Sequence, residues 1–498
     1  MYAAGLPIEL SLNVNLIAVI FLAALGFYLY GYLETKNQWL SLLPSLLYVS
    51  HPYFLVVIFI RGAIAEAWFM GLLPWILTIF SLVRRDKLAN WQLIWTPIIL
   101  TVFFLSHQIM ATLALIILTI WLLVEKQVRL DKKLSGSERK LLLSIGLTIL
   151  LTAFAFIPMI LERQFVRASL GQITGRPITE QLVGLSRLIF DKWRYSGLSG
   201  LASDQGEFAK TVGVTSWLVL GLAAWQFKKC RMQNEKCRIF IFWSLVFGLF
   251  VFMLTPYSAF VWNHLLILEF IQHPWRLLWV SILASVILLV ELLKSKRLSL
   301  PAQAGNLEAR VLVGAIVLSS IWALIFQAHP AGSTRKTAED WQFYGGTGDS
   351  FDELVPISFN SQLNLKLDQQ LVVRNQGQMI YPDLTKEEPN NDGQTKVISW
   401  TGTKMEYQVE ATAAAEVIQR TAYFPGWFAQ VDHQSVTINA QDHEFPGRIV
   451  IKVPAGKSLV QVKFGDSQVR GIGKTLSLMG VGGWAAVLTF MYLKSVIE

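Results

Sequence analysis

Long apolar segments alternate with short charged gaps along most of the chain. The apolar segments lie around residues 11–31, 39–59, 66–83, 92–124, 141–160, 212–227, 239–255, 274–293, 310–328 and 474–493. An α-helix needs roughly 20 apolar residues to cross about 30 Å of hydrocarbon, and most of these segments are long enough. A soluble core would not need so many of them. The pattern therefore predicts a polytopic α-helical membrane protein.

Basic residues collect in alternate gaps between these segments. The basic gaps lie at residues 84–87, 126–140, 228–238 and 294–297. Short cytoplasmic loops are where Lys and Arg accumulate. Segment 92–124 lies between two such gaps, so it must cross an even number of times, and its length suits two short helices that turn near Ser106–His107. With that pair, about eleven spans alternate consistently.

This alternation predicts which parts of the chain face outward. The outer face receives the turns at 60–66 and 106–108, loop 161–211, segment 256–273 and the region 329–473. The C-terminus returns to the cytoplasm at Lys494. The N-terminus falls outside, although residues 1–10 lack the basic region and cleavage site of a signal peptide. Either the protein inserts with its N-terminus outside, or a longer version carries a preceding helix and outer loop.

The region 329–473 has a different pattern, in which apolar and polar residues alternate with period two. Clear examples are 370–374, 448–453 and 459–464, and Pro- and Gly-containing turns separate them. Short alternating runs between turns are typical of an antiparallel β-sandwich. The expected organisation is a helical bundle over 1–328 with outer loop 161–211, an extracytoplasmic β-sandwich over 329–473 and a final transmembrane helix over 474–498.

Composition agrees with a membrane protein and excludes several functions. The chain is 53% hydrophobic and 15% charged, against roughly 25% charged in soluble domains. The net charge of +9 comes from basic residues between spans, so it does not indicate nucleic-acid binding. Cys230 and Cys237 share one basic gap and are expected to be reduced, cytosolic thiols. Phosphate-binding loops, HExxH, GxSxG and paired-Cys motifs do not occur, so no cofactor is evident and no divalent metal is supported.

Candidate chemistry is expected where ionisable residues lie at membrane depth, because such residues are costly in hydrocarbon. The first candidates are Arg61 and Glu66, on either side of Gly62. They form either a structural ion pair across the turn or an anion site in which Arg61 grips a phosphate as a planar fork. The second is His107, which either makes structural hydrogen bonds or contacts a substrate.

A third group of candidates, His273 and Arg276, opens an apolar segment on the predicted outer side. Pro274 suits the first position of a helix, and Trp275 with Arg276 also suits an anchor at the membrane interface. Loop 161–211 adds basic residues that are either incidental or able to hold an anionic lipid or pyrophosphate. The predicted substrate-binding residues are therefore Arg61, Glu66, His107, His273 and Arg276.

Several short motifs, in this order, resemble a known family. They are Arg61–Glu66 with Leu73-Pro74, Leu105-Ser106-His107, Thr152–Phe154 with Ile157–Met159, Phe270–Arg276, Tyr423–Trp427 and Val453–Gly456. The series resembles bacterial integral membrane proteins named for a "6-pyruvoyl-tetrahydropterin synthase-related" domain. These in turn look like polytopic glycosyltransferases of the GT-C type, so the resemblance implies a GT-C-like bundle for residues 1–328.

The resemblance implies sugar transfer from a polyprenyl-phosphate-linked donor in cell-envelope glycan assembly, at the outer face of a bacterial plasma membrane. Arg61, Arg276 and His107 would contact the donor phosphate, and the β-domain would cap the site or present an acceptor. In that class a catalytic carboxylate lies in the first outer loop, where this chain offers only Glu9, so the catalytic residue is unknown.

Two alternatives to an enzyme stay open: a non-catalytic scaffold for envelope polysaccharide assembly, and a lipid-linked sugar transporter. The expected partners are membrane lipids and a polyprenyl-phosphate-linked sugar, with envelope assembly proteins in the scaffold alternative, and no nucleic acid.

Overall fold

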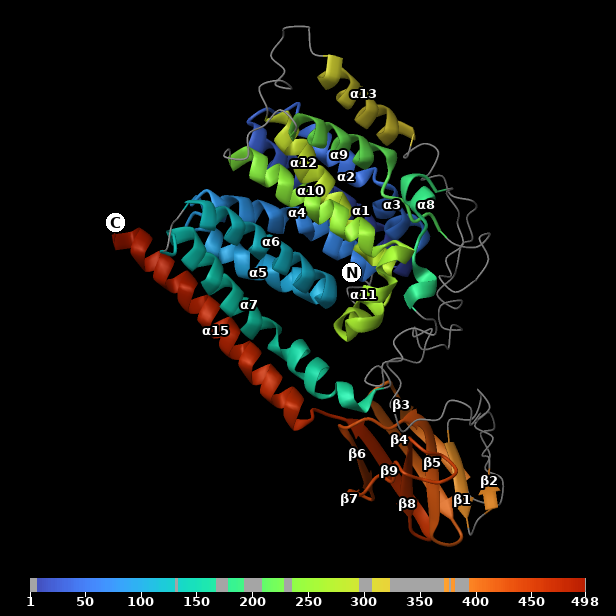
Figure 1. Ribbon diagram of the computed structural model, residues 1–498. Coiled ribbons are helices and arrows are strands. Elements are labelled where there is room, and N and C mark those ends of the chain that lie inside the picture. Colours follow the sequence, from blue (N-terminus) through green and yellow to red (C-terminus); the bar gives the residue numbers. More distant parts are fainter. Residues whose placement is uncertain are drawn as a thin grey trace. The chain divides into compact units, whose positions relative to one another are not determined.

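The computed structural model describes residues 7–129, 133–166, 178–191, 208–227, 235–294, 307–322, 371–375, 378–380 and 394–497. The chain divides into two compact units. The first comprises Met1–Thr152, Arg176–Gly345 and Met479–Glu498, and the second comprises Ala153–Gly175 and Gly346–Leu478. Among the described residues, the first unit is helical and the second contains the strands (Figure 1).

Helices form at each of the predicted apolar segments. They are α1 (Ile8–Thr35), α2 (Leu42–Val49), α3 (Pro52–Leu55) with a π-helical turn (Val56–Ile60), α4 (Ile64–Arg84), α5 (Gln92–Ser106), α6 (Gln108–Arg129), α7 (Gly136–Leu161), α9 (Val214–Phe227), α10 (Glu235–Met253), α12 (Leu278–Leu293), α13 (Leu307–Trp322) and α15 (Gln468–Ile497). Short helices between them are α8 (Leu185–Ile189) and α11 (Ala259–His264), with 3-10 turns at Arg163–Phe165, Ile178–Gln181, Pro256–Ser258, Leu266–Ile271 and Pro274–Leu277.

Among the described residues, fewer helices are long and apolar enough to cross a membrane than the roughly eleven spans predicted. Within the described ranges, six helices are long and apolar enough, or up to eight if each of two bent helix pairs forms one span. Three further apolar helices, including α5 and α9, have only 10–17 residues, less than the roughly 20 that a full crossing needs. The chain is therefore a protein with several candidate membrane spans. The turn predicted near Ser106–His107 separates α5 from α6.

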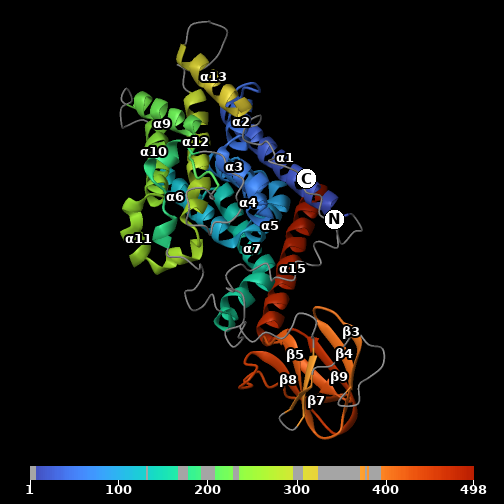
Figure 2. The ribbon, with the colours of Figure 1, turned by 90° about the vertical axis from the view of Figure 1, so that its right-hand side faces the viewer.

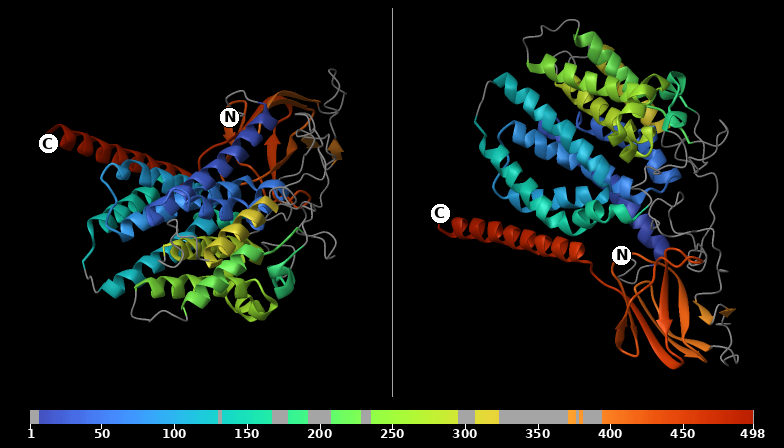
Figure 3. Two further views of the ribbon diagram at one scale, coloured as in Figure 1. Left: turned by 90° about the horizontal axis from the view of Figure 1, so that it is seen from above. Right: turned by 60° about the horizontal axis from the view of Figure 1, so that its bottom comes forward.

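Two helices, α4 and α12, form the interior of the helical unit. Every residue of α12 is buried, as expected for a helix that is apolar on all sides. α12 packs beside α9 and α10 (Figure 2), and α4 packs beside α1, α5 and α6 (Figure 3). The contact between α1 and α4 is close, because a Cβ on Gly26 would lie 2.7 Å from the ring of Pro74.

A buried charge cluster joins α1, α4, α6 and α12. Glu34, whose side chain is fully buried, binds Arg84, Arg85 and Lys294, and Lys294 Nζ lies 2.9 Å from Glu34 Oε2. Arg84 also lies 3.3 Å from Glu125. The cytoplasmic side of the membrane was predicted from gaps that contain Arg84, Arg85 and Lys294. Because these residues pair with Glu34, their charges also have a structural role.

The strands form two antiparallel sheets. The strands are β1 (Leu371–Asn375), β2 (Gln378–Ile380), β3 (Gln394–Trp400), β4 (Lys404–Ala411), β5 (Ala415–Ala422), β6 (Trp427–Val431), β7 (Gln434–Val436), β8 (Arg448–Val453) and β9 (Gly456–Phe464). Their orders are β2-β1-β5-β8 and β3-β4-β9-β6-β7. The buried faces of both sheets contribute to a single apolar core, which includes Val373, Tyr407 and Val462. The three strands predicted from alternation are present, while residues 329–370 lie outside the described ranges.

Arg374 on β1 binds three carboxylates from neighbouring segments of its sheet. Its Nε lies 2.9 Å from Glu416 Oε2 and its Nη1 lies 2.9 Å from Glu444 Oε2, and it also binds Asp442. Burial raises the pKa of the Asp442 carboxyl, but hydrogen bonds from Arg374 and from the backbone N–H groups of Phe445 and Glu444 outweigh this effect, so the pKa is lowered. The cluster fixes the connection between β7 and β8 to the sheet.

The state of Cys237 differs from the prediction. This residue is disulfide-bonded, so the prediction of a reduced thiol is wrong, and Cys230 lies outside the described residues.

Glu162, at the end of α7, forms a 2.8 Å ion pair with Arg470 of α15. Both residues belong to the second unit, in which this pair ties the start of α15 to the end of α7.

We expect Gly480→Ala to destabilise the packing of α15 on α7. A Cβ at Gly480 would lie 2.8 Å from the backbone nitrogen of Leu151, closer than atoms can pack, whereas a Cβ at Gly482 would meet nothing within 4 Å. Overpacking of this kind costs about 1–3 kcal/mol. Thermal unfolding in detergent should show a lower midpoint for Gly480→Ala. Gly482→Ala is the control, and an equal loss in both variants would contradict the close contact.

We expect the β-unit to lose stability in acid through Asp442. The folded pKa lies below the unfolded value of about 3.9, so the carboxylate stabilises the fold above that pH and the contribution is lost as the pH falls through the folded pKa. Proteolytic resistance of the β-unit, measured from pH 6 downward, should fall less steeply in Asp442→Asn. The control is Asp466→Asn, which removes a carboxylate whose side chain is 47% exposed. Parallel profiles for wild type and Asp442→Asn would disprove this role.

Candidate functional site

The turn between Arg61 and Glu66 brings two opposite charges together. The π-helical turn Val56–Ile60 ends at Arg61, and Gly62 reverses the chain with a φ of +55°, which glycine adopts without strain. α4 then begins and carries Glu66 in its first turn, where the helix dipole favours negative charge. Arg61 Nη1 donates a 2.5 Å hydrogen bond to Glu66 Oε2. The two residues therefore meet across Gly62, as the structural interpretation predicted.

The Glu66 carboxylate is buried, and both of its oxygens accept hydrogen bonds. Its side chain is only 3% exposed. Oε1 accepts from the hydroxyl of Tyr53, a fully buried residue of α3. Arg276 also interacts electrostatically with this carboxylate. Glu66 thus holds side chains from α3, from the π-helical turn and from the start of the segment that leads into α12.

Both arginines lie close to the buried ring of Trp275. The Cζ atoms of Arg61 and Arg276 lie 4.3 Å and 6.0 Å from the centroid of the Trp275 ring, within the range of cation–π attraction. His273 stacks on the same ring at 4.8 Å, and Tyr53 meets its edge. These contacts enclose Trp275, so the interpretation of this residue as an interface anchor is wrong.

Two segments of the loop 161–211 complete the surroundings of Trp275. Phe208 packs edge-on against Trp275 at 5.0 Å, and Lys210 is buried with its Nζ 5.6 Å from the Phe208 ring. Gln181 pairs with His273 through a 2.6 Å contact between Oε1 and Nδ1. The loop therefore supplies buried residues that pack around Trp275 and His273, and one of its residues, Lys210, is charged. Four of the basic residues counted in this loop lie outside the described ranges: Arg167, Arg176, Lys192 and Arg194.

The two predicted histidines occupy turns next to this cluster. His107 separates α5 from α6, and its ring meets the edge of Phe69. Burial and the positive charge of Arg276 lower the pKa of His107 to about 4. Burial and the charges of Arg276, Arg61 and Lys210 lower the pKa of His273 to about 3. Both imidazoles are therefore neutral at pH 7 and offer hydrogen-bonding groups rather than charge.

All five residues predicted to bind substrate gather in one part of the helical unit. Arg61, Glu66 and Arg276 interact directly or electrostatically, and His107 and His273 lie within electrostatic range of them. The cluster sits where the π-helical turn ends and where α4 and the Pro274–Leu277 turn begin. Two guanidinium groups and two neutral imidazoles suit the binding of an anion.

No family model matches the chain, and no curated protein and no solved structure matches it either. Within the parts of the chain that the structure describes, no group of three or more His, Cys, Asp or Glu side chains is placed to hold a metal ion. The function must therefore be inferred from the chemistry of this cluster.

Sequence reasoning missed several residues of the site. Tyr53, Phe208 and Gln181 touch Glu66, Trp275 and His273 across the fold, and nothing in their local sequence indicates those contacts. One signal was available: the pair His51-Pro52 interrupts an apolar segment, and proline inside such a segment marks a break. The bend between α2 and the π-helical turn, 53°, occurs at this pair.

We expect Glu66→Leu to destabilise the helical unit strongly. It leaves the Arg61 guanidinium buried without its carboxylate, and breaking one side of a buried pair costs about 3–5 kcal/mol. The double variant Arg61→Met with Glu66→Leu should recover much of this loss. Unfolding midpoints in detergent provide the measurement. Lys404→Met, which breaks an exposed pair with Glu406, is the control and should cost about 1 kcal/mol or less. A double variant no more stable than Glu66→Leu would show that the pair does not stabilise the turn.

Proposed function

We propose that this protein is a membrane-embedded glycosyltransferase that takes its sugar from a polyprenyl-phosphate-linked donor. The observation that carries the proposal is the convergence of Arg61 and Arg276 on one Trp275 ring and one carboxylate. Guanidinium groups bind phosphate as planar forks.

The position of the cluster along α4 supports a donor held at the membrane surface. Glu66 lies in the first turn of α4, and Arg84 is its last residue. At 1.5 Å per residue these two positions are separated by about 27 Å, close to the roughly 30 Å thickness of the hydrocarbon core. A phosphate beside Glu66 and Arg61 would therefore lie near the interface, while the polyprenyl chain extends into the bilayer.

The proposal also covers the location of the protein and the kind of group that it transfers. We place Arg61 and the β-unit outside a bacterial plasma membrane, with the C-terminus in the cytoplasm. The two sheets would form a β-sandwich that caps the site or presents an acceptor. The likeness of the Arg61–Glu66 and Phe270–Arg276 motifs to the family named above, and through it to GT-C enzymes, is the reason for choosing a sugar as the transferred group.

A second candidate, binding without transfer, is favoured by the state of Glu66. Both oxygens of this carboxylate accept hydrogen bonds, from Tyr53 and Arg61, so Glu66 is committed to structure and is poorly placed to act as a general base. A scaffold for envelope polysaccharide assembly would need only the phosphate contacts. A carboxylate that activates the acceptor would have to come from another part of the chain.

We expect a polyprenyl phosphate to bind the purified protein through Arg61 and Arg276. Arg61→Lys keeps the charge but loses the fork, so binding should weaken about tenfold or more, because a charged hydrogen bond contributes about 1.5–3 kcal/mol. Arg276→Lys should behave similarly. Binding to protein in nanodiscs is the measurement, and polyprenol without phosphate is the ligand control.

The matched control is Arg187→Lys, because Arg187 pairs with Asp191 and is not part of the cluster. Equal binding by wild type and Arg61→Lys would show that the Arg61–Glu66 motif has only a structural role. Release of polyprenyl phosphate from a sugar-linked donor separates the two candidates: binding without release would favour the scaffold.

A further inference from the structure

One end of the β-unit meets the ends of two candidate membrane spans. In the first turn of α15, Arg470 donates a 3.0 Å hydrogen bond to Glu162, at the end of α7. Arg470 also donates to the carbonyl oxygen of Gly465, the residue that follows β9, at 3.3 Å. Both α7 and α15 are long and apolar enough to cross a membrane, so their ends at the β-unit would lie at its surface. The same surface would then pass close to the end of β9.

Three exposed side chains form a row across the five-stranded sheet at this end. Phe428 of β6 lies opposite Lys463 of β9, and Lys463 lies opposite Lys404 of β4. Side chains alternate between the two faces of a strand, and the next residues along these strands belong to the core of the β-unit, so the row projects from the outer face. A Cβ at Gly465 would lie 3.1 Å from the ring of Phe428. We call these three residues the Phe428 row, and it lies beside the start of α15.

The two lysines of the Phe428 row repel each other, because like charges directly opposite in a sheet are destabilising. Lys404 lies 3.3 Å from Glu406, in the next row of the sheet. Asp466 is close to Lys463 in sequence but pairs with Lys474 at 2.7 Å. Within the described ranges Lys463 forms no ion pair. The charge of Lys463 is therefore unmatched, and an anion above the row would relieve the repulsion.

The opposite end of β9 has a balanced charge. Lys457 is exposed on the same face of β9, and it lies opposite Glu410 of β4. Lys457 and Lys463 are six residues apart, which corresponds to about 20 Å along a strand. The positive surplus of this face thus occurs at the end where α7 and α15 meet the β-unit.

An exposed ring beside lysines suits the headgroup layer of a membrane. Phe428 is 59% exposed, and apolar side chains insert at the boundary between headgroups and acyl chains. Lysine binds phosphate as a point charge, and basic residues at a membrane surface favour anionic lipids. A soluble anion would neutralise Lys463 but leave Phe428 in water, whereas a phospholipid contacts both.

We propose that the Phe428 row binds anionic phospholipids at the membrane surface where α7 and α15 end. Lys463 and Lys404 contact the phosphate of the headgroup, and Phe428 inserts among the first carbons of the acyl chains. This contact holds one end of the β-unit on the membrane. The inference uses neither Arg61 nor Arg276 and does not depend on sugar transfer.

The experiment uses the full-length protein with p-benzoylphenylalanine in place of Phe428, in nanodiscs that contain equal amounts of phosphatidylglycerol and phosphatidylcholine. Irradiation should attach lipid at this position, and mass spectrometry of the labelled peptide identifies the lipid. Adducts with phosphatidylglycerol should outnumber those with phosphatidylcholine about fivefold, as expected for one unmatched basic residue. The positional control carries the probe in place of Gln434, which is exposed at the far end of the β6–β7 hairpin, about 10 Å farther along the strand. It should form few lipid adducts.

Lys463→Gln, combined with the probe at position 428, should bring the ratio of the two lipids close to one. The matched control is Lys457→Gln, on the same face of the same strand, which should leave the ratio unchanged. In detergent without anionic lipid, Lys463→Gln should keep or raise the unfolding temperature, because it removes a contact between like charges. The assay contains no polyprenyl phosphate and no sugar, so its result is independent of the proposed function.

Four results would overturn the proposal. The first is no more lipid adduct at position 428 than at position 434. The second is a lipid ratio near one in the wild-type background, or a ratio that Lys463→Gln leaves unchanged. The third is attachment to a second copy of the chain in place of lipid, which would assign the row to an interface between copies. The fourth is a lower unfolding temperature for Lys463→Gln than for Lys457→Gln, which would give Lys463 a structural role.

Discussion

Every charge buried among these helices needs a partner, because hydrocarbon and packed side chains solvate ions poorly. α4 meets this requirement at both ends. Glu66 at its start accepts hydrogen bonds from Arg61 and Tyr53, and Arg84 at its end lies 3.3 Å from Glu34 and from Glu125. The helix between them is mostly buried. These two clusters fix α4 against its neighbours, and the candidate site is built on the first of them.

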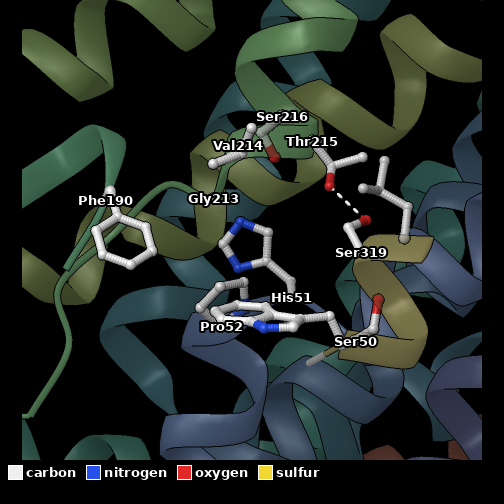
Figure 4. A pocket seen from close by; sticks show the side chains of 11 residues that line it. Ser50, His51, Pro52, Phe190, Gly213, Val214, Thr215, Ser216 and Ser319 are labelled. Carbon is white, nitrogen blue, oxygen red and sulfur yellow. Dashed lines mark hydrogen bonds between the residues drawn. The ribbon is translucent and has the colours of Figure 1, made fainter. Parts of the chain in front are cut away.

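Irregular backbone beside the first cluster creates the places where a ligand could bind. The break at His51-Pro52, the π-helical turn and the reversal at Gly62 follow each other within a short stretch. Each exposes backbone groups that need partners, and each places a side chain that a continuous helix would have directed elsewhere. Tyr53 is directed to Glu66 and His51 to Val212. One interrupted helix therefore positions residues of the charged cluster and residues that line a pocket at the His51-Pro52 break (Figure 4).

The chemistry of the charged cluster follows from its surroundings. Stacking on Trp275 orients Arg61 and keeps its guanidinium plane defined, which favours a ligand with matching planar oxygens. The lowered pKa values of His107 and His273 keep both imidazoles neutral, so these residues add hydrogen-bonding groups without adding charge. Such a site would discriminate by geometry as well as by electrostatic attraction, as the proposed phosphate-linked donor would require.

The sequence by itself determined the helical segments, the turn at His107, several strands and the five residues that gather in the cluster, because hydrophobic period and the cost of buried charge are local signals. Only the tertiary structure decided their contacts. Trp275 is suited by sequence to an interface and is enclosed by the fold, since Phe208 and Arg61 approach it from distant segments. Ser216, a buried residue of α9, carries no sequence signal at all. Among the described residues its hydroxyl has no partner, which depends on how α9 packs against α12 and α13, and such packing is set by the whole chain.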